Sequence, residues 1–256
     1  MSSLWPRFLF IGCLWLYWIP AAALIVSAEE LPYTHGVPWL MPVAPSARNR
    51  LVFLLTFLFV FSSTAFAVRR HQAAAGWAAV ALMALVRQVH KRQWPAERVV
   101  ALGKYAPTAA ALVGYLIAFQ ATRGSSPAFR ERCGWEAACG IIAAAYALAG
   151  WAKCRSSGWG WIGSRNIGLL IAERSFEGPR WLQSFRWGVV ARPRLCAAFA
   201  VLALAVECGG FLFVFPRLRW FFVLGTTALQ AGITLCLGYT EAEWTLIMFA
   251  LTVNSL

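Results

Sequence analysis

The chain has 256 residues, of which 60% are hydrophobic and only 13% are charged, and its mean hydropathy is +0.62. Soluble domains carry about a quarter charged residues, and in water a chain this apolar would leave extended apolar faces uncovered. The composition therefore excludes an ordinary soluble protein and predicts an all-α polytopic transmembrane helix bundle.

The net charge of +13 arises from 23 basic and 10 acidic residues. The basic residues lie in short groups between apolar runs, where they can contact anionic headgroups and hold helix ends at the interface. No basic soluble module remains once the apolar runs are removed, so nucleic acid is not an expected partner. The expected partner is the lipid bilayer, and the expected location is a bacterial inner (plasma) membrane.

Metal and disulfide chemistry have little support in the sequence. His35, His71 and His90 are scattered and form no metal-binding spacing, so no metal site is predicted. The seven cysteines contain no CxxC pair and are interpreted as small buried hydrophobic residues. Cys133 with Cys139 is the one pair that the sequence singles out for a test.

The first apolar run covers residues 8–27 and is followed by two glutamates and a proline-rich loop. A helix needs about 20 apolar residues to cross the hydrocarbon layer, so this run is long enough to span. A signal peptide is the alternative, because Val26-Ser27-Ala28 resembles a cleavage site. We favour an uncleaved helix, since the run is long for a signal peptide and contains Trp15 and Trp18.

Four further runs follow, divided by basic or polar residues. The run at 73–86 is short, so it is expected to be tilted, re-entrant or continued as an interfacial helix through residues 94–100. A polar loop is expected at 122–133. The predicted segments are 51–68, 73–86, 105–121 and 134–152.

The C-terminal part begins with the longest stretch that is not expected to span, residues 153–194, in which arginine and tryptophan alternate. Both residue types favour the headgroup layer. A close helical pair is then predicted at 195–215 and 220–239, and a last short run at 244–256. In total we expect about six to eight helices, some short or interfacial, in a single transmembrane domain over residues 1–256. Loop charges leave the topology open.

Polar residues inside apolar runs require a partner, a water-filled cavity or a function. Glu207 lies deep within a predicted span, beside a glycine pair that would let another helix approach closely. Gln230, in the following helix, is the nearest polar candidate, and a structural hydrogen bond between the helices is the favoured interpretation for this pair. Lys153 follows a long apolar run. It is either a lysine that reaches the headgroups from a helix end or a base in an apolar site.

One stretch resembles a known family. The sequence Tyr146-Ala-Leu-Ala-Gly-Trp-Ala-Lys153, followed by Trp159 and Gly163, resembles a segment of the horizontally transferred transmembrane (HTTM) domain, the membrane part of vitamin K-dependent gamma-carboxylases. The later hairpin is also similar, because in that family an intramembrane glutamate is followed by a short basic turn and another helix. The resemblance is clearest over residues 134–256.

The resemblance implies that Lys153 acts as the base toward a reduced quinone, with Glu207 as the second catalytic residue. We also expect Tyr146, Trp159 and Gln230 to bind the ligand, although the family often has histidine at the position of Gln230. The carboxylases carry a paired lysine where this sequence has Ala152-Lys153.

Three functions follow as hypotheses. The first is a membrane-embedded enzyme or maturation factor that acts on a peptide, quinone or lipid. The second is a non-catalytic protein that binds or transports a lipid or a small apolar solute. The third is a structural subunit of a larger membrane complex, with a membrane protein as its partner. Whether the chain is an enzyme stays open.

Overall fold

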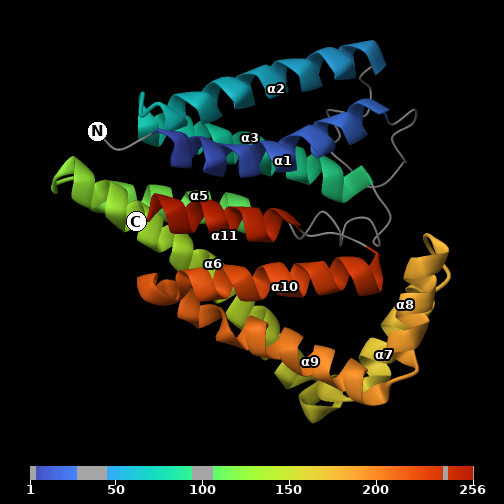
Figure 1. The fold of residues 1–256 in the computed structure, drawn as a ribbon. Helices are drawn as coiled ribbons and strands as arrows, with labels where there is room; N and C mark the ends of the chain where they lie inside the picture. The colour runs from blue at the N-terminus through green and yellow to red at the C-terminus, as the bar shows by residue number, and fades with distance from the viewer. Residues whose placement is uncertain (1–3, 28–44, 94–105, 239–241, 256) are drawn as a thin grey trace. The chain divides into compact units, whose positions relative to one another are not determined.

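The fold is helical throughout the residues that the computed structural model describes, namely 4–27, 45–93, 106–238 and 242–255 (Figure 1). These residues form ten α-helices and no strand, so the all-α prediction is confirmed for them. The bounds are α1 Trp5–Ser27, α2 Pro45–Ala67, α3 Gln72–Gln93, α5 Ala106–Ala121, α6 Pro127–Ser157, α7 Ser164–Arg174, α8 Arg180–Val190, α9 Pro193–Cys208, α10 Arg219–Leu237 and α11 Ala242–Asn254.

Four helical stretches within the described residues are long and apolar enough to cross a membrane. They are Asn49–Ala67, Pro127–Ser157, Pro193–Val214 and Pro216–Leu237. This number is smaller than the six to eight that the sequence predicts. The other apolar helical stretches of the described residues have 10 to 17 residues. The shorter apolar stretches are Trp5–Leu16, Gln72–Val86, Pro107–Ala121 and Trp244–Asn254. The structure does not test whether the first segment is cleaved. The predicted interfacial helix through residues 94–100 lies outside the described residues.

The chain divides into two compact units, residues 1–138 with 253–255 and residues 139–252 with 256. Unit 1 contains α1, α2, α3, α5 and the start of α6. Unit 2 contains the rest of α6, α7 to α10, most of α11 and three short 3₁₀ helices, η1 (Gly158–Ile162), η2 (Gly209–Val214) and η3 (Pro216–Leu218). The single transmembrane domain over residues 1–256 stays a prediction.

The polar loop predicted at 122–133 is much shorter in the structure, because α6 already begins at Pro127. Proline is favoured in the first turn of a helix, where its missing N–H leaves no hydrogen bond unmade. The charged residues Arg130, Glu131 and Arg132 continue the helix instead of interrupting it. Charged residues argue against exposure to lipid, but they do not prevent a helix from forming.

Glycine and proline set the helix ends in unit 2. Helix α9 begins at Pro193, and α10 ends before Gly238, which adopts φ 77° and donates its N–H to the carbonyl oxygen of Thr234. A left-handed residue after the last helical residue is a common helix stop. In Figure 1 the short helices α7 and α8 lie side by side, and residues of α9 and α10 pack against α7. The stretch 153–194, expected not to span, contains η1, α7 and α8, none of which is long enough to span.

In unit 1, α2 and α3 are joined by a tight turn that shapes the polar cluster described below. Arg69 and His71 have positive φ values of 62° and 47°. The N–H of Arg70 donates to the carbonyl oxygen of Ala65 at 2.9 Å, the hydrogen bond of a Schellman cap. Left-handed backbone costs a residue with a side chain about 1–2 kcal/mol, so tertiary contacts have to hold this turn.

Candidate functional site: a buried arginine cluster and a lysine–glutamate pair

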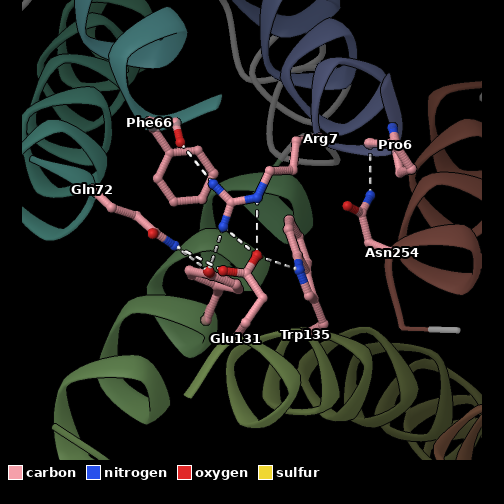
Figure 2. Close-up of polar contacts among 8 residues, drawn as sticks. Pro6, Arg7, Phe66, Gln72, Glu131, Trp135 and Asn254 are labelled. Carbon is pink, nitrogen blue, oxygen red and sulfur yellow. Dashed lines mark hydrogen bonds and ion pairs between the residues drawn. The ribbon is translucent and has the colours of Figure 1, made fainter. Parts of the chain in front are cut away.

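Unit 1 contains a buried ion pair between Arg7 of α1 and Glu131 of α6 (Figure 2). The side chain of Arg7 is only 2% exposed and that of Glu131 is 19% exposed. The Nε and one terminal nitrogen of Arg7 both donate to Oε1 of Glu131, the Nε at 2.9 Å. The indole N–H of Trp135 donates to the same oxygen at 3.0 Å. The carboxylate is therefore held by a cation and a neutral donor together.

The remaining donors of Arg7 connect it to two more helices, and the second of these contacts extends to a third. One terminal nitrogen donates to the carbonyl oxygen of Phe66, near the end of α2, at 2.9 Å. The other donates to the hydroxyl of Tyr115 in α5 at 2.9 Å, and Gln72 at the start of α3 donates to the same hydroxyl. Figure 2 shows these side chains converging on the guanidinium of Arg7. Five helices of unit 1 thus meet at one arginine.

The Arg7 cluster is best explained as structural. Each nitrogen of the guanidinium has an acceptor, and one of these acceptors, the carbonyl of Phe66, lies in the last turn of a helix, where carbonyl groups have no intrahelical donor. A buried charge is tolerated when it is paired and its hydrogen bonds are satisfied. Four of the five N–H donors of Arg7 thus have acceptors within unit 1, which is the arrangement of a structural arginine.

Two other arginines, both in unit 2, cap helix ends in the same way. Arg186 is 1% exposed, and its guanidinium donates to the carbonyl oxygens of Leu235 at 2.8 Å, Arg174 at 2.6 Å and Glu177 at 3.0 Å. Arg219 is also 1% exposed and donates to the carbonyl oxygen of Phe213 at 3.0 Å. The general expectation that arginines contact headgroups is therefore wrong for these buried side chains.

The two polar residues that the sequence singles out, Lys153 and Glu207, form an ion pair in unit 2. Lys153 lies near the end of α6 and Glu207 near the end of α9, and the ammonium of Lys153 donates to Oε1 of Glu207. The Nζ of Lys153 also lies 5.1 Å from the ring centroid of Trp161 in η1. The side chains are 29% and 14% exposed, so the pair is only partly covered.

Glycines bring α6 close enough to α9 and η2 for this pair to form. A Cβ atom on Gly150 would lie 2.6 Å from the backbone nitrogen of Cys208. A Cβ on Gly210 would lie 2.5 Å from the Cβ of Tyr146 and 2.8 Å from the nitrogen of Ala147. Both distances are shorter than van der Waals contact, so only glycine fits. The second residue of the glycine pair beside Glu207 thus permits the close helix approach that the sequence predicts.

Two polar atoms beside Lys153 have no hydrogen-bond partner among the described residues. They are Oε2 of Glu207, which is an acceptor, and Nε1 of Trp161, which is a donor, and both are buried. Most buried polar atoms in proteins have a partner, and leaving one unsatisfied costs about 1–3 kcal/mol. The pair therefore leaves one acceptor and one donor for a molecule that supplies the complementary groups.

An apolar cavity of about 300 Å³ lies between α7, α9 and α10. Its walls include Ile171 from α7, Val206 from α9 and Leu229 from α10, and all of its lining residues are apolar. Val206 directly precedes Glu207, and successive side chains leave a helix about 100° apart. The cavity and the ion pair thus occupy neighbouring faces of α9.

The other predicted site residues are distributed differently. Tyr146 packs edge-on against Phe222 and Trp244, with ring centroids 5.5 Å and 4.9 Å away. Gln230 is buried, but Glu207 pairs with Lys153, and Oε1 of Gln230 has no partner in the described part of the chain. The backbone of Trp159 lies in η1, and its side chain lies outside the described residues. Their ligand-binding roles stay predictions.

The sequence reasoning did not single out Arg7, Glu131 or Trp161. Arg7 precedes the first apolar run, and Glu131 is flanked by two arginines in what was expected to be a loop. One signal could have found Glu131, because it is the only acidic residue between Glu97 and Glu136, in a stretch rich in arginine. Nothing in the sequence distinguishes Trp161 from the other tryptophans of its region.

Groups of three or more metal-ligating side chains do not occur among the described residues. No protein-family model matches this chain, and no curated protein or solved structure is significantly similar to it.

Proposed function

We propose that this chain is an integral membrane protein whose C-terminal unit binds a lipid-like small molecule with a hydroxyl head. The observation that carries the proposal is the pair of buried, unpartnered atoms beside Lys153, the Oε2 of Glu207 and the Nε1 of Trp161. A hydroxyl group donates one hydrogen bond and accepts others, so it offers both kinds of group that these atoms lack.

Membrane integration is supported by the large apolar side chains on the surface of the spanning-length helices. Phe53, Phe57 and Phe61 of α2 are 77%, 61% and 68% exposed, and Leu224 of α10 is 65% exposed. A soluble protein rarely exposes contiguous apolar surface of this extent, whereas lipid tails are a favourable environment for it. A bacterial inner membrane is the location that we propose.

The apolar cavity supplies a place for the tail of the ligand. Ligand pockets are mostly apolar with a few polar groups that fix orientation, and a cavity of about 300 Å³ is at the lower end of their range. Because Val206 lines the cavity and Glu207 follows it, a bent amphiphile could place its tail between α7, α9 and α10 and its head at the ion pair. Lys153 would keep the carboxylate of Glu207 neutralised.

The proposal is tested by photolabelling the purified protein in detergent with a long-chain alcohol that carries a diazirine on its chain. Gly232 lines the cavity, and a Cβ there would meet no atom within 4 Å, so Gly232→Leu fills the cavity without a backbone clash. Gly140→Leu is the matched control, since Gly140 has the same open space and does not line the cavity.

We expect labelling of residues in α7, α9 and α10 that unlabelled alcohol competes away. This labelling should be lost in Gly232→Leu and kept in Gly140→Leu. Competition that is equal in the two variants, or labelling that never saturates, would exclude the cavity as a binding site.

A second candidate function is proton transfer by an enzyme similar to the HTTM proteins, with a reduced quinone as cofactor and a peptide or lipid as substrate. The contact between Lys153 and Glu207 favours it, because two groups that can exchange a proton lie together. The ion pair uses the ammonium form of lysine, however, whereas a base has to be the neutral amine. Lys153→Arg separates the two functions. Arginine keeps the charge but cannot give up its proton, so catalysis would be lost while alcohol labelling is retained.

A further inference from the structure

Two thiols lie within the contact between α6 and α9. The sulfur atoms of Cys154 and Cys208 are 4.0 Å apart, and both residues are partly exposed. Among the other cysteines, four are buried, and Cys133 is partly exposed but belongs to unit 1. The pair that the sequence singled out, Cys133 with Cys139, has one buried member. The structure thus favours a different pair of thiols.

The backbones on either side of this pair are already close. Gly150 lies one helical turn before Cys154, and a Cβ on it would lie 2.6 Å from the nitrogen of Cys208. A disulfide needs Cα atoms about 4.4–6.8 Å apart and sulfur atoms about 2.05 Å apart. The sulfur atoms therefore have to approach by about 2 Å from their separation of 4.0 Å for the bond to form. Cys208 is also the last residue of α9, where the helix changes to the 3₁₀ form of η2.

Each thiol belongs to the residue that follows a member of the ion pair in the sequence. Cys154 directly follows Lys153, and Cys208 directly follows Glu207. A covalent bond at this place would fix the separation of α6 and α9 one residue away from the lysine–glutamate contact.

We propose that Cys154 and Cys208 form a reversible disulfide that links α6 to α9. The oxidant is an exchangeable disulfide compound. One cysteine thiolate attacks it, releasing one thiol and forming a mixed disulfide, and the second cysteine then displaces the other thiol. In total two cysteine thiols are oxidised, one external disulfide is reduced to two thiols, and the two protons pass to these products. The disulfide proposal does not depend on the proposed lipid binding, because it rests only on the positions of the two thiols.

Dithiodipyridine, an aromatic disulfide that releases a coloured thione at each exchange, tests the proposal on the folded protein in detergent. We expect the pair to release two thiones, and peptide mass spectrometry to find Cys154 cross-linked to Cys208. In Cys208→Ser, Cys154 should instead release one thione and retain a mixed disulfide. Cys133→Ser is the matched control, because it removes a partly exposed thiol of unit 1 and should leave the cross-link intact.

Mixed disulfides on both cysteines without a cross-link would overturn the proposal, as would no reaction at the pair. A second measurement guards against variants that misfold. Oxidation should raise the thermal unfolding midpoint of the wild-type protein, and reduction should reverse the shift. The variant Cys154→Ser/Cys208→Ser should show no such shift, and an equal shift in this variant would also contradict the proposal.

Discussion

Replacing Arg7 with methionine is expected to destabilise unit 1 strongly. The guanidinium of Arg7 makes four hydrogen bonds to Glu131, Phe66 and Tyr115, and the substitution removes all of them while leaving the carboxylate of Glu131 largely buried. Removing one partner of a buried ion pair costs about 3–5 kcal/mol. Because the side chain of Glu131 remains 19% exposed, we expect a loss of about 3 kcal/mol, the lower end of that range.

The free energy of unfolding can be measured by urea titration of the protein in mixed micelles. Arg123→Met is the matched control, since Arg123 is exposed, and an exposed substitution changes stability by about 0.5 kcal/mol or less. The double variant Arg7→Met/Glu131→Gln should recover a large part of the loss, because no unpaired charge remains. Equal stability of Arg7→Met and Arg123→Met would refute the assignment of Arg7 as the structural centre of unit 1.

Three further predictions follow from the packing of unit 2. Arg186→Lys keeps the charge but cannot reproduce the three backbone contacts of the guanidinium, so it should lower the free energy of unfolding by about 2 kcal/mol in the same titration. A stability within error of wild type would contradict this capping role. Gly210→Ala should cost about 1–3 kcal/mol because its Cβ would overlap Tyr146, whereas Gly140→Ala, in open space, should not destabilise. Trp161→Phe keeps an aromatic ring beside Lys153 and removes the indole N–H, so the affinity for the alcohol should fall roughly fivefold in a competition assay. Trp151→Phe, at an exposed position, should bind the alcohol as the wild-type protein does.

The sequence predicts the all-α class and most of the helical segments, because apolar runs bounded by charged residues mark the stretches that are unfavourable in water. The segment at 51–68 agrees with α2, and the hairpin at 195–215 and 220–239 agrees with α9, η2 and α10. The ends of the helices are harder to predict from the sequence. The early start of α6 at Pro127 shows why, since a helix can carry charged residues in its first turns when they face a partner such as Arg7.

The candidate site is predictable only in part. Glu207 and Lys153 stand out because an isolated charge in an apolar run is costly, and this cost applies wherever the residue ends up in the fold. Their pairing, and the contribution of Trp161, depend on the approach of α6 to α9 at Gly150, a long-range contact that periodicity does not encode. The same limit explains why Gln230 was expected as the partner of Glu207.

Native mass spectrometry of the detergent-purified protein tests most directly whether the buried atoms beside Lys153 hold a ligand. We expect the wild-type protein to retain one hydroxyl-bearing apolar molecule per chain, and Trp161→Phe to retain it at lower occupancy. A wild-type mass equal to that of the bare polypeptide, even after incubation with the long-chain alcohol, would show that Glu207 and Trp161 do not form a binding site.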